Sequence, residues 1–182
     1  MGQPKAWLPF HGETMLARVV RLLRDVVEPI VVVAAPGQEV PPVQDVEIVR
    51  DACKDRGPLQ GLAAGLLALT GRADAAFLSS CDVPFLKPPV VRRLIDLLGA
   101  HSICVPRAGE YHHPLAAVYR LEVADAVTAL LTKDRLRPVF LFDKLPTRVV
   151  QAAELADIDP DFESFQNINT PEEYEQALQR NV

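Results

Sequence analysis

The sequence has few cysteines, no cluster of basic residues and no long apolar run, and each of these absences excludes a class of protein. Its three cysteines, Cys53, Cys81 and Cys104, show no C-x-x-C spacing, which favours reduced thiols over a disulfide or zinc framework. With 19 Lys and Arg against 24 Asp and Glu, the net charge is -5, and we expect no nucleic-acid partner. The longest apolar run, 30–35, is far shorter than the roughly 20 residues of a membrane helix. No export signal is visible, so we predict a cytoplasmic protein without membrane association.

The pattern of apolar residues predicts helices that alternate with strands along 182 residues, a length that suits a single domain. The expected helices are 14–27, 57–70, 88–98 and 122–131, and the expected strands are 30–35, 46–50, 75–80, 102–106 and 115–120. The last strand should run antiparallel, through a turn at 107–111. This order predicts an open, mostly parallel sheet with helices on both faces. In such sheets ligands bind at the carboxyl ends of the strands.

Two charged residues are candidates for phosphate and metal chemistry. Lys5 lies in a turn rich in Gly and Pro, where its ammonium group could bind a phosphate, although a solvated surface lysine is the simpler interpretation. Asp82 follows the strand 75–80, and Pro84 prevents that strand from continuing. A carboxylate at this edge suits Mg²⁺, which binds one or two carboxylates together with substrate phosphates. The alternative is a turn aspartate that bonds to its own backbone.

The segment Asp51 to Gly61 follows a strand and enters a helix at Gly57-Pro58, where free backbone amides could bind an anion. Gly61 and Gly65 lie on one face of that helix, which indicates the close approach of either a ligand or a neighbouring strand.

Near the end of the chain, Asn167 and Asn169 are two residues apart in an extended segment, so their side chains can reach a ligand on the same side. The following Thr170-Pro-Glu-Glu173 is a capping box, which predicts the start of a helix. His112 and His113 are adjacent and face opposite ways, and neither has a partner at zinc spacing, so we do not assign them to a metal site.

Five pieces of the sequence together resemble one family. They are Met1-Gly-Gln-Pro-Lys5, Gly57-Pro-Leu-Gln-Gly61, Cys81-Asp-Val-Pro-Phe85, His113-Pro114 and Asn167-Ile-Asn-Thr-Pro-Glu-Glu173. Their order and spacing are similar to those of molybdenum-cofactor guanylyltransferases over essentially the whole chain. The G-P-L-x-G and C-D-x-P-F pieces are shared with molybdopterin cytidylyltransferases, whereas the N-I-N-T-P-E-E ending favours the guanylyl branch.

The resemblance implies a Rossmann-like, three-layer α/β/α nucleotidyltransferase domain over residues 1–182. It would transfer GMP from GTP to molybdopterin, or to Mo-molybdopterin, and release pyrophosphate. Mg²⁺ would be the cofactor, and cofactor-biosynthesis proteins and molybdoenzyme chaperones would be partners. A cytidylyltransferase and a non-catalytic binding domain remain as alternatives.

The resemblance also implies roles for particular residues. Lys5 and Asp82 would be catalytic, with Asp82 also binding the metal. The GTP-binding residues would be Lys5, Asp51, Gly57, Gly61 and Asp82. The molybdopterin-binding residues would be His113, Asn167 and Asn169.

The sequence departs from the family pattern in two places. The family begins with a strand and a glycine-rich loop before the M-G-x-x-K element, whereas this sequence begins at that Met. Because a missing first strand would leave backbone groups unpaired at the centre of the sheet, we expect the full protein to carry roughly 10 to 20 more residues. After the strand 30–35, Ala34-Ala-Pro-Gly37 replaces an expected asparagine near the base, which leaves the choice between GTP and CTP open.

Overall fold

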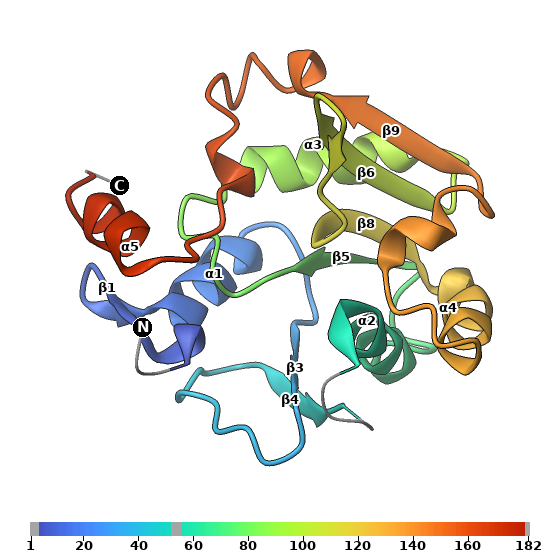
Figure 1. Cartoon of the computed structure of the whole chain (residues 1–182), viewed down its shortest axis with the longest axis horizontal. Helices are drawn as coiled ribbons and strands as arrows, with labels where there is room; N and C mark the ends of the chain where they lie inside the picture. Colours follow the sequence, from blue (N-terminus) through green and yellow to red (C-terminus); the bar gives the residue numbers. More distant parts are fainter. Residues whose placement is uncertain (1–3, 52–55, 181–182) are drawn as a thin grey trace.

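The computed structural model describes residues 4–51 and 56–180, which form helical layers on both sides of β-sheet structure (Figure 1). The strands are β1 (Pro9–Phe10), β2 (Glu13–Thr14), β3 (Val31–Ala34), β4 (Glu47–Arg50), β5 (Ala75–Ser79), β6 (Ile103–Ala108), β7 (Tyr111–His112), β8 (Ala116–Arg120) and β9 (Thr147–Gln151). The α-helices are α1 (Met15–Arg24), α2 (Gly57–Ala68), α3 (Pro88–Leu98), α4 (Ala124–Thr132) and α5 (Pro171–Leu178). Short 3-10 turns are η1 (Lys5–Trp7), η2 (Leu121–Val123), η3 (Pro138–Leu141), η4 (Ala152–Glu154) and η5 (Glu163–Phe165).

The larger sheet has most of its length in strands that run the same way. β8 pairs antiparallel with both β5 and β6, so β5 and β6 are parallel to each other, and β9 is parallel to β6. The two-residue β7 forms a hairpin with β6. β3 and β4 form a separate parallel pair. The expected α/β fold, with a mostly parallel sheet that includes an antiparallel strand, is therefore confirmed.

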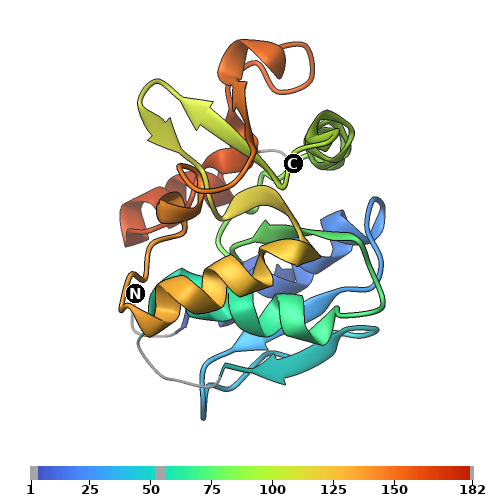
Figure 2. The same cartoon turned by 90° about the vertical axis from the view of Figure 1, so that its right-hand side faces the viewer.

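Helices cover both faces of the larger sheet, and successive residues of β6 show why. α2 and α4 lie side by side on one face (Figure 2), where Ile103 and Val105 belong to the apolar cluster beneath them. α3 covers the opposite face, where Cys104 packs with Leu94 and Val118. Because side chains alternate along a strand, an uninterrupted apolar run such as 103–105 is buried on both sides.

The sheet is interrupted between β3 and β5. Among the strands of the described residues, β3 pairs only with β4, and β5 pairs only with β8. All five residues of β5 and three of the four residues of β3 are only half-buried, whereas Ile103, Cys104 and Val105 of β6 are fully buried. The unpaired strand edges expected from the sequence are thus present within residues 4–51 and 56–180.

Several elements differ from the sequence-based predictions. β9 and the β1–β2 hairpin were not predicted, because each is short and has no strong alternation. The turn expected at 107–111 is shorter, because Gly109-Glu110 joins β6 to β7, and β8 begins only after His113-Pro114. The helix expected from Glu122 begins as the turn η2 and becomes α-helical at Ala124. The prediction for 88–98 matches α3, and the capping box before α5 is confirmed.

Candidate active site

Lys5 and Asp82 form the centre of a polar cluster at the carboxyl end of β5. The Nζ atom of Lys5 lies 2.6 Å from Oδ2 of Asp82 and donates a second hydrogen bond of 2.8 Å to Oδ1 of Asn169. The Asp82 side chain is 11% exposed and that of Lys5 is 33% exposed. Neither simple alternative holds, because Lys5 is not a solvated surface lysine and the Asp82 carboxylate binds side chains that are distant in sequence.

Asn167 completes the cluster from the other side of the carboxylate. Its Nδ2 atom donates to Oδ1 of Asp82 at 2.7 Å and to the hydroxyl oxygen of Ser80 at 3.1 Å. The side chains of Asn167 and Asn169 therefore reach the same group of polar atoms, as their two-residue spacing predicts. Ser80 was not predicted as a site residue, although it directly precedes Cys81-Asp82.

Backbone contacts hold the loop that carries Asp82. The amide of Ile168 donates to the Asp82 carbonyl at 3.0 Å, which joins this loop to the segment that carries both asparagines. On the other side, Nε of Arg18 donates to the Pro84 carbonyl at 2.7 Å. Arg18 lies in α1 among other arginines, but it is only 7% exposed. The signal in the sequence is its spacing, because Arg18 lies three residues after the buried Met15 and shares its face.

The segments before and after this loop are joined by an apolar cluster. It combines residues from the N-terminal hairpin, the Asp82 loop and the C-terminal region: Leu8, Phe10, Met15, Phe85, Ile168 and Ala177. The hydroxyl of Tyr174 on α5 also donates to the Pro9 carbonyl. The two ends of the described chain therefore meet beside the polar cluster, which is how Lys5 reaches Asn169.

His113 lines a small cavity of about 180 Å³ together with Asn167. Its ring contacts the rings of Phe162 and Phe165, with centroids 5.5 and 5.2 Å away. Burial, followed by the charge of His112, lowers the pKa of His113 below its ordinary value. The ring of His112 packs instead against Phe142. The two histidines thus face different partners, as the sequence predicts, and His113 shares a cavity with an asparagine of the cluster.

The glycines of α2 pack against β3. A Cβ atom at Gly65 would lie 3.5 Å from Val33 Cγ2, and one at Gly61 would lie 4.0 Å from Val33 Cγ1. This close approach favours strand packing over a ligand as the reason for the Gly61–Gly65 spacing. Gly57 has φ of +67°, a backbone conformation that glycine adopts without strain.

Asp51 follows β4 at the same edge as the end of β3, since its amide donates to the Ala34 carbonyl at 2.9 Å. The polar cluster is formed by hydrogen bonds among Lys5, Asp82, Asn167 and Asn169. Asp51, Gly57 and Gly61 belong instead to the β4–α2 side of the molecule.

Two of the three cysteines lie within the described residues, and both are free thiols. Burial raises the pKa of Cys104 to about 12. Burial, followed by the charge of Asp82, raises the pKa of Cys81. These thiols are therefore protonated near neutral pH and poor nucleophiles. The prediction of a reduced thiol at Cys53 lies outside the described residues.

The donor atoms of the cluster are suited to a hard cation that also binds phosphate. Asp82 supplies a carboxylate and Ser80 a neighbouring hydroxyl oxygen, whereas Asn167 directs its amide nitrogen toward both. Within residues 4–51 and 56–180, no group of three or more His, Cys, Asp or Glu side chains could hold a metal by itself. A single carboxylate fits Mg²⁺, which completes its coordination with water and substrate oxygens.

Comparison with known proteins decides the family. A profile of the MobA-like NTP transferase domain matches residues 1–148, which is most of the sequence. The chain belongs to this family. A relative from Desulfosudis oleivorans, named molybdenum cofactor guanylyltransferase, is 34% identical over 177 residues, which cover 97% of this chain and 86% of the relative.

Solved structures have the same fold as this MobA-like chain. Molybdopterin-guanine dinucleotide biosynthesis protein A from Archaeoglobus fulgidus superposes with a TM-score of 0.77 at 22% identity, covering 98% of this chain and 90% of that protein. A Mycobacterium tuberculosis protein solved in complex with manganese superposes with a TM-score of 0.65 at 18% identity, covering 98% of this chain and 94% of that one. None of the helices formed by the described residues is long and apolar enough to cross a membrane.

Proposed function

We propose that this protein is a nucleotidyltransferase that transfers GMP from GTP to the terminal phosphate of molybdopterin and releases pyrophosphate. The observation that carries this proposal is the cluster of Lys5, Asp82, Asn167 and Asn169 at the carboxyl end of β5. Ligands of open α/β sheets bind at this edge. The name and 34% identity of the Desulfosudis relative support the choice of substrates.

The chemistry of the reaction explains which residue types the cluster contains. The attacking group, a phosphate of the acceptor, is already an anion, so the enzyme needs no general base. Its task is to align two anionic substrates and to neutralise the charge that develops at the α-phosphate and the leaving pyrophosphate. The ammonium group of Lys5 provides a fixed positive charge for this purpose.

Asp82 is the residue that would hold Mg²⁺, with the substrate's phosphate oxygens as further ligands. When bound, the metal would supply additional positive charge beside the phosphates. Because one carboxylate is a weak site, we expect metal binding to depend on the nucleotide. Mn²⁺ titrated alone should bind much more weakly than Mn²⁺ titrated in the presence of GTP.

The side of the cluster that faces His113 would receive molybdopterin. Asn167 belongs to both the polar cluster and the small cavity next to His113, so one side chain connects the two regions. Its amide can donate to an acceptor phosphate in place of the Ser80 hydroxyl, while Lys5 remains with the nucleotide. Asp51 and Gly57, on the β4–α2 side, would contact the nucleotide, whereas Gly61 packs against Val33.

The test measures GMP transfer by the protein isolated from its native source. The assay contains labelled GTP, Mg²⁺ and molybdopterin. Competition by unlabelled CTP decides which base is preferred. We expect Asp82→Asn to lower the transfer rate at least about 100-fold. Asp74→Asn is the matched control, because Asp74 is exposed and lies at the opposite end of β5.

A folded protein without GMP transfer would overturn the proposal. Full transfer activity in Asp82→Asn would show that the cluster takes no part in the reaction. Stronger competition by CTP than by GTP would instead assign the protein to the cytidylyl branch. Absence of both transfer and metal-dependent GTP binding would favour a non-catalytic domain.

A further inference from the structure

The carboxylate of Asp159 joins the β5–α3 loop, which carries Asp82, to the η4–α5 segment, which carries both asparagines. Its side chain is fully buried, and its Oδ1 atom lies 2.7 Å from Nζ of Lys87. Oδ1 also accepts the amide of Glu163 at 3.1 Å, and Oδ2 accepts the amide of Ser164 at 3.0 Å. A buried carboxylate is costly unless it is paired and hydrogen-bonded, so this charge is stable only while the loop and the segment stay together.

The loop and the segment are also fixed to each other at two backbone positions. The Lys87 amide donates to the Ser164 hydroxyl oxygen at 3.0 Å. Further along, the Ile168 amide donates to the Asp82 carbonyl at 3.0 Å. The two stretches therefore lie side by side and are held near both ends. Asn167 lies between the two fixed points, which determine where its side chain meets the Asp82 carboxylate.

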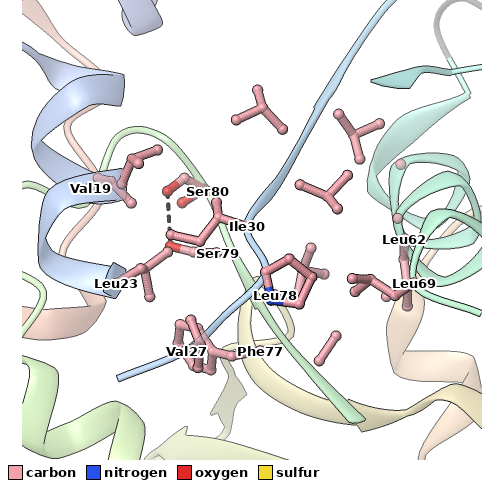
Figure 3. A pocket seen from close by; sticks show the side chains of 18 of the residues that line it. Val19, Leu23, Val27, Ile30, Leu62, Leu69, Phe77, Leu78, Ser79 and Ser80 are labelled. Atoms are coloured by element: carbon pink, nitrogen blue, oxygen red, sulfur yellow. Dashed lines mark hydrogen bonds between the residues drawn. The ribbon is translucent and has the colours of Figure 1, made fainter. Parts of the chain in front are cut away.

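On another side, the β5–α3 loop begins beside an apolar cavity. This cavity of about 610 Å³ lies between β3 and β5, and its lining includes Ser80 together with Val19 and Leu23 of α1 (Figure 3). Apolar side chains cannot hydrogen-bond to Ser80 or Asp82. Both residues instead receive a hydrogen bond from Asn167 of the η4–α5 segment. The position of that segment therefore controls the polar contacts at the carboxyl end of β5.

Asp159 also begins a strained turn. Phe162 has φ of 56°, a left-handed conformation that bulky residues rarely adopt, and its amide donates to the Asp159 carbonyl at 3.0 Å. The centroid of its ring lies 4.2 Å from that of Phe165 and 5.5 Å from that of His113. Such strain persists only where the surrounding contacts impose it. The turn that Asp159 holds thus presents two aromatic rings to His113.

We propose that Asp159 is a positioning residue for the acceptor side of the active site, where His113 and Asn167 share a cavity. Paired with Lys87, it fixes the segment that carries Asn167 and the turn whose rings pack against His113. In this role the carboxylate acts through other residues. The identity of the acceptor rests on the proposed function, whereas the positioning of the segment does not.

The first experiment measures steady-state GMP transfer by Asp159→Asn, with each substrate varied in turn. Asparagine keeps the shape of the side chain but loses the charge that pairs with Lys87. We expect KM for molybdopterin to rise about tenfold, because the acceptor side is no longer held in place. KM for GTP should change less than about twofold, because Lys5 keeps its bond to Asp82.

Asp157→Asn is the matched control for these kinetics. Asp157 lies in the same segment, but its ion pair with Arg93 is exposed, so both KM values should stay unchanged. An unchanged KM for molybdopterin in Asp159→Asn would overturn the proposal. An equal rise in both KM values would overturn it as well, because a general loss of structure would then explain the effect.

The second experiment follows amide hydrogen exchange at Ile168 by NMR and needs no substrate. The Ile168 amide bonds to the Asp82 carbonyl and not to Asp159. Asp159→Asn should speed its exchange at least about tenfold, because the segment opens more often, and should leave the amides of β6 unchanged. Faster exchange confined to the amides of Glu163 and Ser164 would show that Asp159 is only a local cap, and would overturn the proposal.

Two variants of Lys87 test the same link while Asp159 still accepts both amide bonds, and they decide the question even if Asp159→Asn does not fold. Lys87→Met removes the positive charge, so it should speed exchange at Ile168. Lys87→Arg keeps the charge, so its exchange rate should stay closer to that of the unchanged protein. Equal exchange in Lys87→Met and the unchanged protein would overturn the proposal. If the unchanged protein transfers no GMP, the proposed function fails, whereas the exchange rates still decide the role of Asp159.

Discussion

At the scale of single residues, Lys5 combines a structural contact with a proposed catalytic charge. We expect Lys5→Met to lower kcat/KM for GMP transfer about 100-fold, because a fixed positive charge beside the phosphates is lost. The free energy of unfolding should fall by only about 1 kcal/mol, since the Lys5 side chain is 33% exposed and Asp82 keeps its bond to Asn167. Lys133→Met, at an exposed position, is the control. A loss of stability without a loss of activity would show that Lys5 has only a structural role.

His113 should make stability depend on pH. Burial lowers its pKa from the ordinary value of 6.5, so the unfolded chain takes up a proton at a higher pH than the folded chain. The free energy of unfolding should therefore be largest above pH 6.5 and decrease as the pH falls below that value. In His113→Asn this decrease should be smaller when chemical denaturation is measured from pH 7.5 to 5.5.

The control for this pH dependence is His11→Asn. His11 is exposed, and its φ of 47° is one that asparagine tolerates. Its pH profile should match that of the unchanged protein. If His113→Asn also leaves the profile unchanged, burial of the ring does not control the pH dependence.

At the scale of elements, α1 anchors the loop that carries Asp82. We expect Arg18→Met to lower the free energy of unfolding by about 1 to 3 kcal/mol, because the Pro84 carbonyl loses its buried donor. Transfer activity should fall as well, since the carboxylate is less firmly held. Arg24→Met should cost less than about 1 kcal/mol, because its ion pair with Asp45 is exposed. Equal effects in urea denaturation would show that the Pro84 contact contributes little.

The start of α5 fixes the segment that holds both asparagines. Thr170 accepts a hydrogen bond from the Glu173 amide, and the Glu173 carboxylate accepts bonds from the amides of Asn169 and Thr170. Thr170→Ala should lower the free energy of unfolding by about 1 kcal/mol. Thr128→Ala, on the exposed surface of α4, should be neutral or slightly stabilising, because alanine has the higher helix propensity. Thermal denaturation of both variants measures the contrast.

At the scale of the whole molecule, we propose that the chain folds as one domain in which helix α2, which contacts both β3 and α4, couples the β3–β4 pair to the larger sheet. Trp7, the single tryptophan, belongs to the apolar cluster that includes Val32 of β3, so its fluorescence reports on the β3 side of the molecule. Fluorescence and far-UV circular dichroism should therefore give the same denaturation midpoint. A fluorescence change at a lower denaturant concentration would show that the β3 side unfolds independently of the larger sheet.

The sequence was sufficient to predict the elements with strong periodicity and clear end signals. Helix α3 begins at a proline and ends before Gly99, and its predicted bounds are those observed. Strand β9 was missed because its five residues owe their conformation to pairing with β6, a contact between distant parts of the chain. Propensity is a weak guide where tertiary pairing decides the structure.

The sequence pointed to several residues of the polar cluster, but not to the contacts between them. Spacing correctly placed the two asparagines on one side, and the edge of the sheet pointed to Asp82. No local pattern shows that Lys5 binds Asp82, because 77 residues separate them. The role of Arg18 was likewise hidden, since a charged residue between apolar ones is usually solvated and only the packed loop reveals its acceptor.

Lys5 and Asn169 meet across 164 residues, so the cluster joins the first and last parts of the described chain. This arrangement determines when a newly synthesised chain can first bind substrate. Contacts between distant residues form late in folding, because a long loop must close first. While the ribosome is still translating the region before Asn167, the nascent chain has Lys5 and Asp82 but lacks both asparagines. Substrate can therefore be bound in the proposed way only after both asparagines have been translated. A messenger RNA truncated before their codons encodes no complete site.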